Sequence, residues 1–159
     1  MPLIDKKTGK PLKSLIEKVI KSDYTQISKS KQYTFIWKEE SKNEVYKIYL
    51  KDQGNEVLGL VSLIDCPEEY RLHINLIEVG LSNRGKDKEI ENIAGCLIAF
   101  ACQIAFDRDY FGFVSLKPKT RLIGLYQDKY GFRQYGRLMA VEQHSSMDLI
   151  KKYWLNEEK

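Results

Sequence analysis

The sequence is poor in cysteine, and its three cysteines, Cys66, Cys96 and Cys102, show no C-x-x-C spacing. An odd number of cysteines without such a pattern excludes a disulfide framework and gives no basis for a zinc site. We therefore expect a reducing, cytoplasmic setting and no bound metal.

Long apolar runs are also missing. The most apolar stretch, residues 93–106, is too short to span a bilayer and contains Gln103. The first residues, MPLIDKKTGK, have no apolar h-region, so we expect neither a signal peptide nor a membrane partner. Internal repeats and low-complexity linkers are absent too, and the 159 residues fit one globular domain.

The composition supports a packed core, because hydrophobic residues make up 43% and charged residues 30% of the chain. The net charge of +4 is uneven, since residues 1–33 contain eight lysines against three acids and the rest is close to neutral. Such a basic segment could attract nucleic acid. No aromatic residues alternate with these lysines, so we expect a solvated lysine-rich face rather than a nucleic-acid partner.

Hydrophobic periodicity predicts a helix over residues 11–22 and strands over 33–38, 45–51 and 57–64, with a turn at 52–55 and a break at Pro67. Alternation then predicts a strand over 71–79, and a stripe at helical spacing predicts a long helix that ends near DRDYFG, residues 107–112. The remaining pattern predicts a strand at 111–117, a helix at 120–132 closed by Gly131, a strand at 133–143 and a helix at 145–155 capped by Ser145 or Ser146.

Antiparallel candidates early in the chain and strand–helix alternation later indicate an α/β (α+β mixed) fold. We expect a central mixed, mostly antiparallel, twisted sheet of about six or seven strands with helices on both faces.

The stretch EVGLSNRGKDKEIENIAGCLIAF, residues 78–100, joins a strand to the long helix through a charged loop. Such a junction can present backbone N–H groups to an anion. Together with NIAGCLIAFAC and the downstream KTRLIGLYQDKYGF, it resembles the GNAT superfamily (Gcn5-related N-acetyltransferases), in a bacterial subgroup, over residues 57–143.

The resemblance implies one GNAT-like domain over residues 1–159, with strands splayed at a cofactor slot and acetyl-CoA as co-substrate. Its acceptor side would be residues 1–55, its acyl-CoA-binding core 57–143 and its C-terminal helix 144–159. In this reading the partners are acetyl-CoA and an amine acceptor.

The family's pyrophosphate loop, R/Q-x-x-G-x-G/A, fits this chain in two registers. One starts at Arg84 and matches the first half only. The other keeps the spacing to the helix and puts Glu89 in the Arg/Gln slot, Asn92 in a glycine slot and Ala94 in the last position, so the loop is degenerate. We prefer the second register because it keeps the spacing to the apolar stripe of the helix, and Asn is the residue that best tolerates a positive φ after glycine.

The resemblance also implies which residues contact the co-substrate. Leu81 replaces the family's usual proline, and we expect Gly80 to host the bulge that splays the strand. The side chains of Lys86 and Lys88 could offset the charge of Glu89. The full set of cofactor-binding candidates is Val79, Gly80, Leu81, Lys86, Lys88, Asn92, Ile93, Ala94, Gly95 and Tyr126.

Two catalytic residues follow from the resemblance. Tyr126 would donate a proton to the leaving thiolate, with Tyr130 as its local rival. Glu78 would be the base, because it shares strand parity with Leu72, Ile74 and Leu76 and burial would raise the pKa of its carboxyl. Water is the alternative base, as are His73 and His144.

Three functions therefore compete. The first is an N-acetyltransferase that moves an acetyl group to a primary amine of a small molecule or protein by direct attack. The second is a catalytically silent GNAT-fold module that binds acyl-CoA or a protein, and the third is a nucleic-acid-binding domain. The acceptor is not identified, although the acidic cluster of Glu39, Glu40 and Glu44 could attract a cationic amine.

The oligomeric state is open. Tyr153 and Trp154 could pack on the core or on a second subunit of a homodimer.

Overall fold

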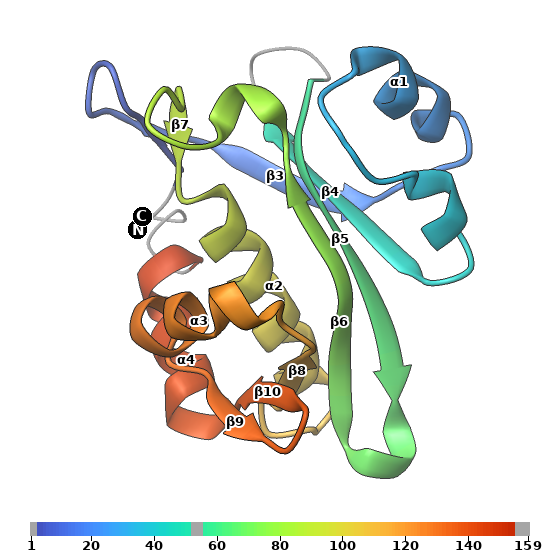
Figure 1. Ribbon diagram of the computed structural model, residues 1–159, viewed down its shortest axis with the longest axis vertical. Helices are drawn as coiled ribbons and strands as arrows, with labels where there is room; N and C mark the ends of the chain where they lie inside the picture. Colours follow the sequence, from blue (N-terminus) through green and yellow to red (C-terminus); the bar gives the residue numbers. More distant parts are fainter. Residues whose placement is uncertain (1–2, 52–55, 155–159) are drawn as a thin grey trace.

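The fold is built on a mixed sheet of seven strands (Figure 1). The computed structural model describes residues 3–51 and 56–154, so the turn expected at 52–55 lies outside the described residues. The strands are β3 (Ser14–Lys18), β4 (Glu44–Leu50), β5 (Val57–Cys66), β6 (Arg71–Val79), β8 (Val114–Leu116), β9 (Arg133–Tyr135) and β10 (Leu138–Val141). Their order is β3-β4-β5-β6-β8-β10-β9, and β6 and β8 form the parallel pair in an otherwise antiparallel sheet. The expected mixed, mostly antiparallel sheet is confirmed.

A second, smaller sheet lies at one end of the molecule. It joins β1 (Leu3–Asp5), β2 (Pro11–Leu12) and β7 (Ile90–Glu91) in the order β2-β1-β7. An N-terminal hairpin therefore pairs with the segment that precedes the long helix (Figure 1).

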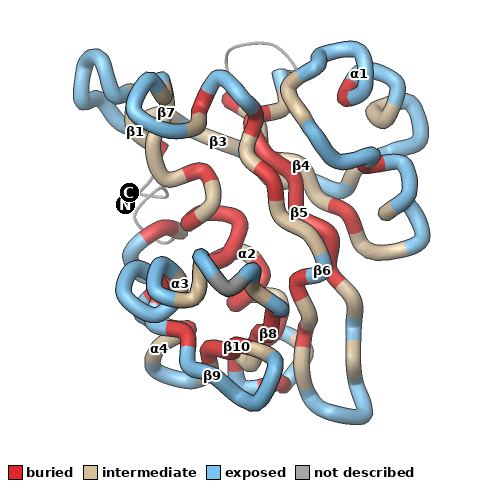
Figure 2. Tube along the Cα trace, in the orientation of Figure 1, coloured by how far each residue is buried: buried red, intermediate tan, exposed pale blue. Residues whose placement is uncertain are grey.

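Helices cover both faces of the large sheet. They are α1 (Asp23–Ser30), α2 (Ile93–Asp107), α3 (Ile123–Tyr130) and α4 (Gln143–Tyr153), with short 3₁₀ turns η1 (Trp37–Glu40), η2 (Pro67–Glu69), η3 (Leu81–Asn83) and η4 (Thr120–Leu122). The main core lies between the sheet, α2 and α4, and Figure 2 shows α2 as largely buried. A second cluster of Ile27, Trp37, Val45 and Leu60 lies on the side of α1 and η1. Within the described ranges, every helix is too short or too polar to cross a membrane.

Close helix packing explains two glycines of the core. A Cβ on Gly59 would lie 2.8 Å from the Ile93 side chain, so the glycine lets α2 approach β5. A Cβ on Gly95 would lie 2.5 Å from the Tyr153 ring, so Gly95 admits α4. Tyr153 is buried, and the Trp154 ring packs against Phe100, so both aromatic residues pack on the core of this chain.

The helix predicted over residues 11–22 is wrong. Residues 14–18 instead form β3, which pairs with β4 from Ser14–Leu50 to Lys18–Tyr46. The apolar residues of this segment fit the periodicity of a helix as well as that of a strand. Pairing with a strand distant in the sequence decides between the two structures.

The strand predicted over residues 33–38 is also wrong, because these residues form a turn and enter η1. The backbone N–H groups of Thr34 and Phe35 donate to the Glu78 carboxylate rather than to a neighbouring strand.

The end of the chain differs in detail. The segment predicted as one strand over 133–143 is a hairpin of β9 and β10, which turns at Gly136 with φ of 63°. The N-cap of α4 is Glu142, not Ser145 or Ser146. The Ser146 hydroxyl is buried and donates to the Gly112 carbonyl at 2.6 Å, so it serves packing. The predicted strand at 71–79 matches β6, and Gly131 closes α3 as predicted.

Candidate active site

The parallel strands β6 and β8 separate partway along their length. Their pairing runs from Leu72–Val114 to Ile74–Leu116, whereas β6 continues to Val79. The separation follows a β-bulge in β6, because Ser62 of β5 is paired with Leu76 and the next residue, Leu63, with Ile74. Asn75 is thus the extra residue, and such a bulge bends the strand. The splay therefore starts at Asn75 and not at Gly80.

The bulge also reverses the faces of β6. Leu72 and Ile74 pack in the main core, whereas Leu76 packs on the side of α1. Glu78 shares the face of Leu76, so the expectation that it shares a face with Leu72 and Ile74 is wrong.

The loop from β6 to α2 ends in a left-handed residue. Asn92 is the N-cap of α2 and has φ of 76°. The second register expects this conformation, which glycine or asparagine adopts at low cost. The first-turn N–H groups of α2 form the positive end of the helix dipole and favour an anion.

Asn83 organises this loop and is not among the site residues predicted from the sequence. It is buried, and its side-chain carbonyl accepts hydrogen bonds from the N–H groups of Glu89 and Ile90 at 3.2 and 2.8 Å. Asn is common in such local turns, which is the signal in the sequence that could have found it.

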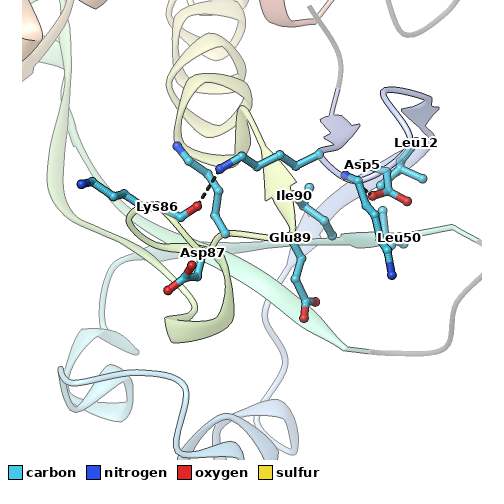
Figure 3. Close-up of a pocket in the computed structure, with 10 residues that line it drawn as sticks. Asp5, Leu12, Leu50, Lys86, Asp87, Glu89 and Ile90 are labelled. Atoms are coloured by element: carbon cyan, nitrogen blue, oxygen red, sulfur yellow. Dashed lines mark hydrogen bonds between the residues drawn. The ribbon is translucent and has the colours of Figure 1, made fainter.

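The N-terminal hairpin also contacts the loop between β6 and α2. Ile4 and Asp5 pair with Glu91 and Ile90, and the Lys6 ammonium donates to the Lys86 carbonyl at 2.6 Å (Figure 3). A cavity of about 510 Å³ lies between hairpin and loop. In Figure 3 the Glu89 carboxylate points away from α2, so its charge is directed away from the helix N-terminus.

Lysines from three elements gather beside the start of α2. Burial lowers the pKa of the Lys129 ammonium on α3, and the charges of Lys88 and Lys152 lower it further, against a smaller effect of Glu91. Such mutual repulsion means that this region has an excess of positive charge and favours an anionic group.

Glu78 is the most heavily hydrogen-bonded side chain of the site. Only 5% of its surface is exposed. Its carboxylate accepts hydrogen bonds from the Thr34 N–H and hydroxyl, both at 2.7 Å, and from the Phe35 N–H at 3.3 Å. The Trp37 indole donates to it at 2.8 Å and the Arg84 guanidinium at 2.6 Å. Glu78 thus ties β6 to the segment before η1 and to the loop.

These bonds change the expected protonation of Glu78. Burial alone would raise the pKa of its carboxyl, but the hydrogen bonds from Thr34, Trp37 and Arg84 outweigh burial and hold the pKa below its ordinary value. The expectation of a raised pKa is therefore wrong. A carboxylate with a lowered pKa and several committed donors is a poor proton acceptor, so its surroundings favour a positioning role.

A second, larger cavity lies on the other side of this network. It measures about 1320 Å³ and is lined by residues between 18 and 45, including α1 and η1. Thr34, Phe35 and Trp37, which are bonded to Glu78, belong to its wall.

Several solved structures share this architecture. Ard1 from Thermoplasma volcanium superposes with a TM-score of 0.62 at 12% identity, over 83% of this chain and 99% of its own. The spermidine/spermine N-acetyltransferase SpeG from Vibrio cholerae gives 0.61 at 13% identity, over 86% and 96%. AtaTR, solved bound with AcCoA, gives 0.59 at 14% identity, over 87% and 98%. No family model and no curated protein matches the sequence.

The chain has the GNAT fold. At these identities the likeness shows the fold, and the resemblance over residues 57–143 agrees with it.

In this GNAT fold the end of β6 offers less free backbone than expected. The Gly80 N–H donates to the Leu58 carbonyl at 2.9 Å, and the Leu81 N–H donates to the Gln32 carbonyl at 3.0 Å. Both groups are committed within the chain, so the roles expected for Gly80 and Leu81 as backbone partners of a ligand are not supported.

The main-chain groups of β6 that face the opening between β6 and β8 belong to residues just before Gly80. Main-chain groups of successive residues in an antiparallel strand point to opposite sides. Because the Gly80 N–H points to β5, the main-chain groups of Ile77 and Val79 point to the other side of the strand, where β6 and β8 splay apart. The Val79 carbonyl accepts a bond from the Arg84 guanidinium at 2.6 Å.

The residues of the first turn of α2 differ in how deeply they are buried. Ile93 is buried in the core, Gly95 is buried against Tyr153, and Ala94 is half-buried. None of the three residues has a polar side chain, so only their backbone N–H groups could bind an anion.

Tyr126 lies on α3 and is half-buried against the core. Its ring contacts Tyr130 and Phe132, with centroids 6.0 and 5.6 Å away. Burial raises the pKa of its hydroxyl, which keeps the proton in place at neutral pH. Tyr130, the rival, is more deeply buried.

The histidines are poorly placed for the base role. His73 lies on the paired half of β6, where its Nδ1 is 2.8 Å from the Ser115 hydroxyl, and burial lowers the pKa of its imidazole. His144 lines a small cavity of about 170 Å³ beside β10 and the start of α4.

The acidic cluster expected to attract a cation is divided. Glu44 pairs with both terminal nitrogens of Arg108, at 2.6 and 3.0 Å. Glu40 accepts hydrogen bonds from Asn43 and Asn75. Two of its three carboxylates are therefore already engaged.

Proposed function

We propose that the chain is an N-acetyltransferase that moves an acetyl group from acetyl-CoA to a primary amine. The observation that carries this proposal is the splay of β6 from β8 beside the N-terminus of α2, which starts at the left-handed Asn92. A structure with the same fold is described as bound with AcCoA, which supports the choice of co-substrate.

The residues fit the parts of acetyl-CoA. The backbone N–H groups of Ile93, Ala94 and Gly95 would bind the pyrophosphate, as helix N-termini bind phosphates. Lys88 and Lys129 add positive charge beside it. The edge of β6 at Ile77 and Val79 would hold the pantetheine arm through main-chain bonds.

The chemistry needs a proton donor and a neutral amine. Acetyl-CoA supplies the acetyl group as a thioester. Tyr126 holds a proton on its hydroxyl and would donate it to the leaving sulfur. Since Glu78 is committed to five hydrogen bonds, we assign proton removal from the amine to water.

Calorimetric titration of acetyl-CoA tests the proposal, with 3′-dephospho-CoA and ATP as comparison ligands. We expect a dissociation constant on the order of micromolar to tens of micromolar, within the range common for enzyme substrates. An absence of binding at millimolar acetyl-CoA would overturn the proposal.

Turnover is then followed as release of free thiol with a panel of amines. Binding without release of thiol from any amine would favour the catalytically silent acyl-CoA module instead.

A further inference from the structure

The cavity between residues 18 and 45 has a distinct chemical character. Part of its wall is apolar and includes the buried residues Ile27, Trp37 and Val45. Ile20, Phe35 and Ile36 also line it, and they expose 62%, 45% and 68% of their surface. Exposed apolar side chains gathered around one hollow are typical of a ligand site.

The charged residues in this lining are all of one sign. Lys18, Lys21, Lys29 and Lys38 line the cavity, and no Asp or Glu does among the described residues. A hollow with cationic side chains and apolar walls favours a ligand with an anionic group on an apolar body.

Two acids near this lining, Asp23 and Glu40, are already paired with other groups. Asp23 accepts hydrogen bonds from the Ile20 N–H at 2.9 Å and from the Lys47 ammonium at 3.1 Å. Glu40 is held by Asn43 and Asn75. The lysines of the lining are therefore not neutralised by these carboxylates.

The cavity also borders the opening of the sheet. Phe35 of its wall is bonded through its N–H to Glu78, near the end of β6. The ammonium of Lys119, which follows β8, lies 6.0 Å from the centroid of the Phe35 ring. The wall thus contacts β6 and the segment that follows β8.

We propose that this cavity binds the acceptor, and that the acceptor is a small amine with an apolar body and an anionic group such as a carboxylate. This proposal rests on the proposed function for the transfer itself. It sets this chain apart from SpeG, whose name gives the polycations spermidine and spermine as its substrates. A polycation would meet four lysines here.

The lysines would also help the reaction. Neighbouring positive charge lowers the pKa of an incoming ammonium, so more of the amine is neutral at a given pH. The amine nitrogen then forms a bond to the acetyl carbonyl carbon, the carbon–sulfur bond breaks, and the sulfur takes a proton from Tyr126 while water takes the amine proton. A cationic site thus removes part of the need for a carboxylate base.

Matched probes test the class of acceptor without relying on turnover. Phenylalanine carries a carboxylate that phenylalanine amide lacks, on the same apolar body, and spermidine serves as the polycation. Calorimetry on the full chain should give phenylalanine about tenfold tighter binding than its amide, a difference of about 1.4 kcal/mol. Spermidine should bind more weakly than either.

A charge-reversed variant tests the lysines. Lys21→Glu with Lys38→Glu should bring the ratio between phenylalanine and its amide to about one. Lys13→Glu with Lys151→Glu, at exposed positions outside the lining, is the matched control and should keep the ratio. Equal binding of acid and amide, tighter binding of spermidine, an unchanged ratio in the first variant, or no binding of any probe would each overturn the proposal.

The two proposals fail separately. Phenylalanine binding with its acid preference, but no acetyl-CoA binding, would leave an anion-selective amine site and remove the acetyltransferase. Acetyl-CoA binding with no preference for the acid would leave the acetyltransferase and remove this acceptor class.

Discussion

The Glu78 carboxylate accepts a hydrogen bond of 2.8 Å from the indole N–H of Trp37. This bond joins the end of β6, beside the proposed cofactor slot, to η1, which lines the proposed acceptor cavity. The same carboxylate holds Arg84 of the loop at 2.6 Å. One buried side chain therefore ties β6 and the loop that follows it to η1, which is distant in the sequence.

Glu78→Gln should destabilise the protein by about 1–3 kcal/mol, because a neutral amide leaves buried donors unsatisfied. Unfolding in urea at pH 7 measures the loss. Glu39→Gln, at an exposed position, is the control and should change the free energy of unfolding by less than about 0.5 kcal/mol. If the Glu78→Gln protein were as stable as the wild type, the hydrogen bonds to the Glu78 carboxylate would not contribute the expected stability.

The contribution of Glu78 to the free energy of unfolding should also depend on pH. Because the pKa of its carboxyl is lower in the folded state than in the unfolded state, its stabilisation is present above the unfolded pKa and is lost as the pH falls through the folded value. The stability gap between wild type and Glu78→Gln should therefore narrow in acid, as urea titrations at neutral and acidic pH would measure. A gap that widens in acid would mean that the carboxyl is protonated in the native state.

Asn92 should tolerate glycine and reject a β-branched residue. Asn92→Gly keeps access to φ of 76°, whereas Asn92→Val does not. We expect acetyl-CoA affinity within about threefold of wild type for the first and at least about tenfold weaker for the second, which equals about 1.4 kcal/mol. Circular dichroism establishes that both variants fold, and equal affinities would show that the loop conformation does not matter for binding.

Tyr126→Phe should lower kcat about 10- to 100-fold at unchanged acetyl-CoA affinity, because it removes only the proton donor. Tyr130→Phe, one helical turn away, should leave kcat within about threefold. Steady-state kinetics with calorimetry separates the two effects. Equal kcat in wild type and Tyr126→Phe would assign proton donation to solvent.

Gly95→Ala should destabilise the protein by about 1–3 kcal/mol, because the new Cβ would lie 2.5 Å from the Tyr153 ring. Gly124→Ala on α3 is the matched control, since a Cβ there meets no atom within 4 Å and alanine favours helix. Thermal unfolding should place the two variants on opposite sides of the wild type. A neutral Gly95→Ala would mean that α4 can move away at little cost.

Local patterns were enough for the core of the fold. Strand β6 follows from alternation, α2 from its apolar stripe and the end of α3 from Gly131, because each of these signals lies within a few residues. The left-handed conformation at Asn92 also follows locally, since few residue types adopt it. The resemblance over residues 57–143 rests on these same segments.

Predictions from local patterns were wrong where contacts with residues distant in the sequence determine the structure. Residues 14–18 form a strand because β4 offers an edge for pairing, and residues 33–38 stay out of the sheet because Glu78 accepts the N–H groups of Thr34 and Phe35. The bulge at Asn75 is not visible in a strand of regular alternation, yet it turns Glu78 to the other face.

The sequence by itself determined the order of the later elements, the candidate loop and the residues that could bind an anion, because short-range periodicity and backbone preference encode them. The tertiary structure decided that Glu78 is a buried, low-pKa anchor, that an N-terminal hairpin clasps the loop, and that four lysines surround one apolar cavity. These features depend on contacts between residues far apart in the chain, and no local pattern records which of them meet.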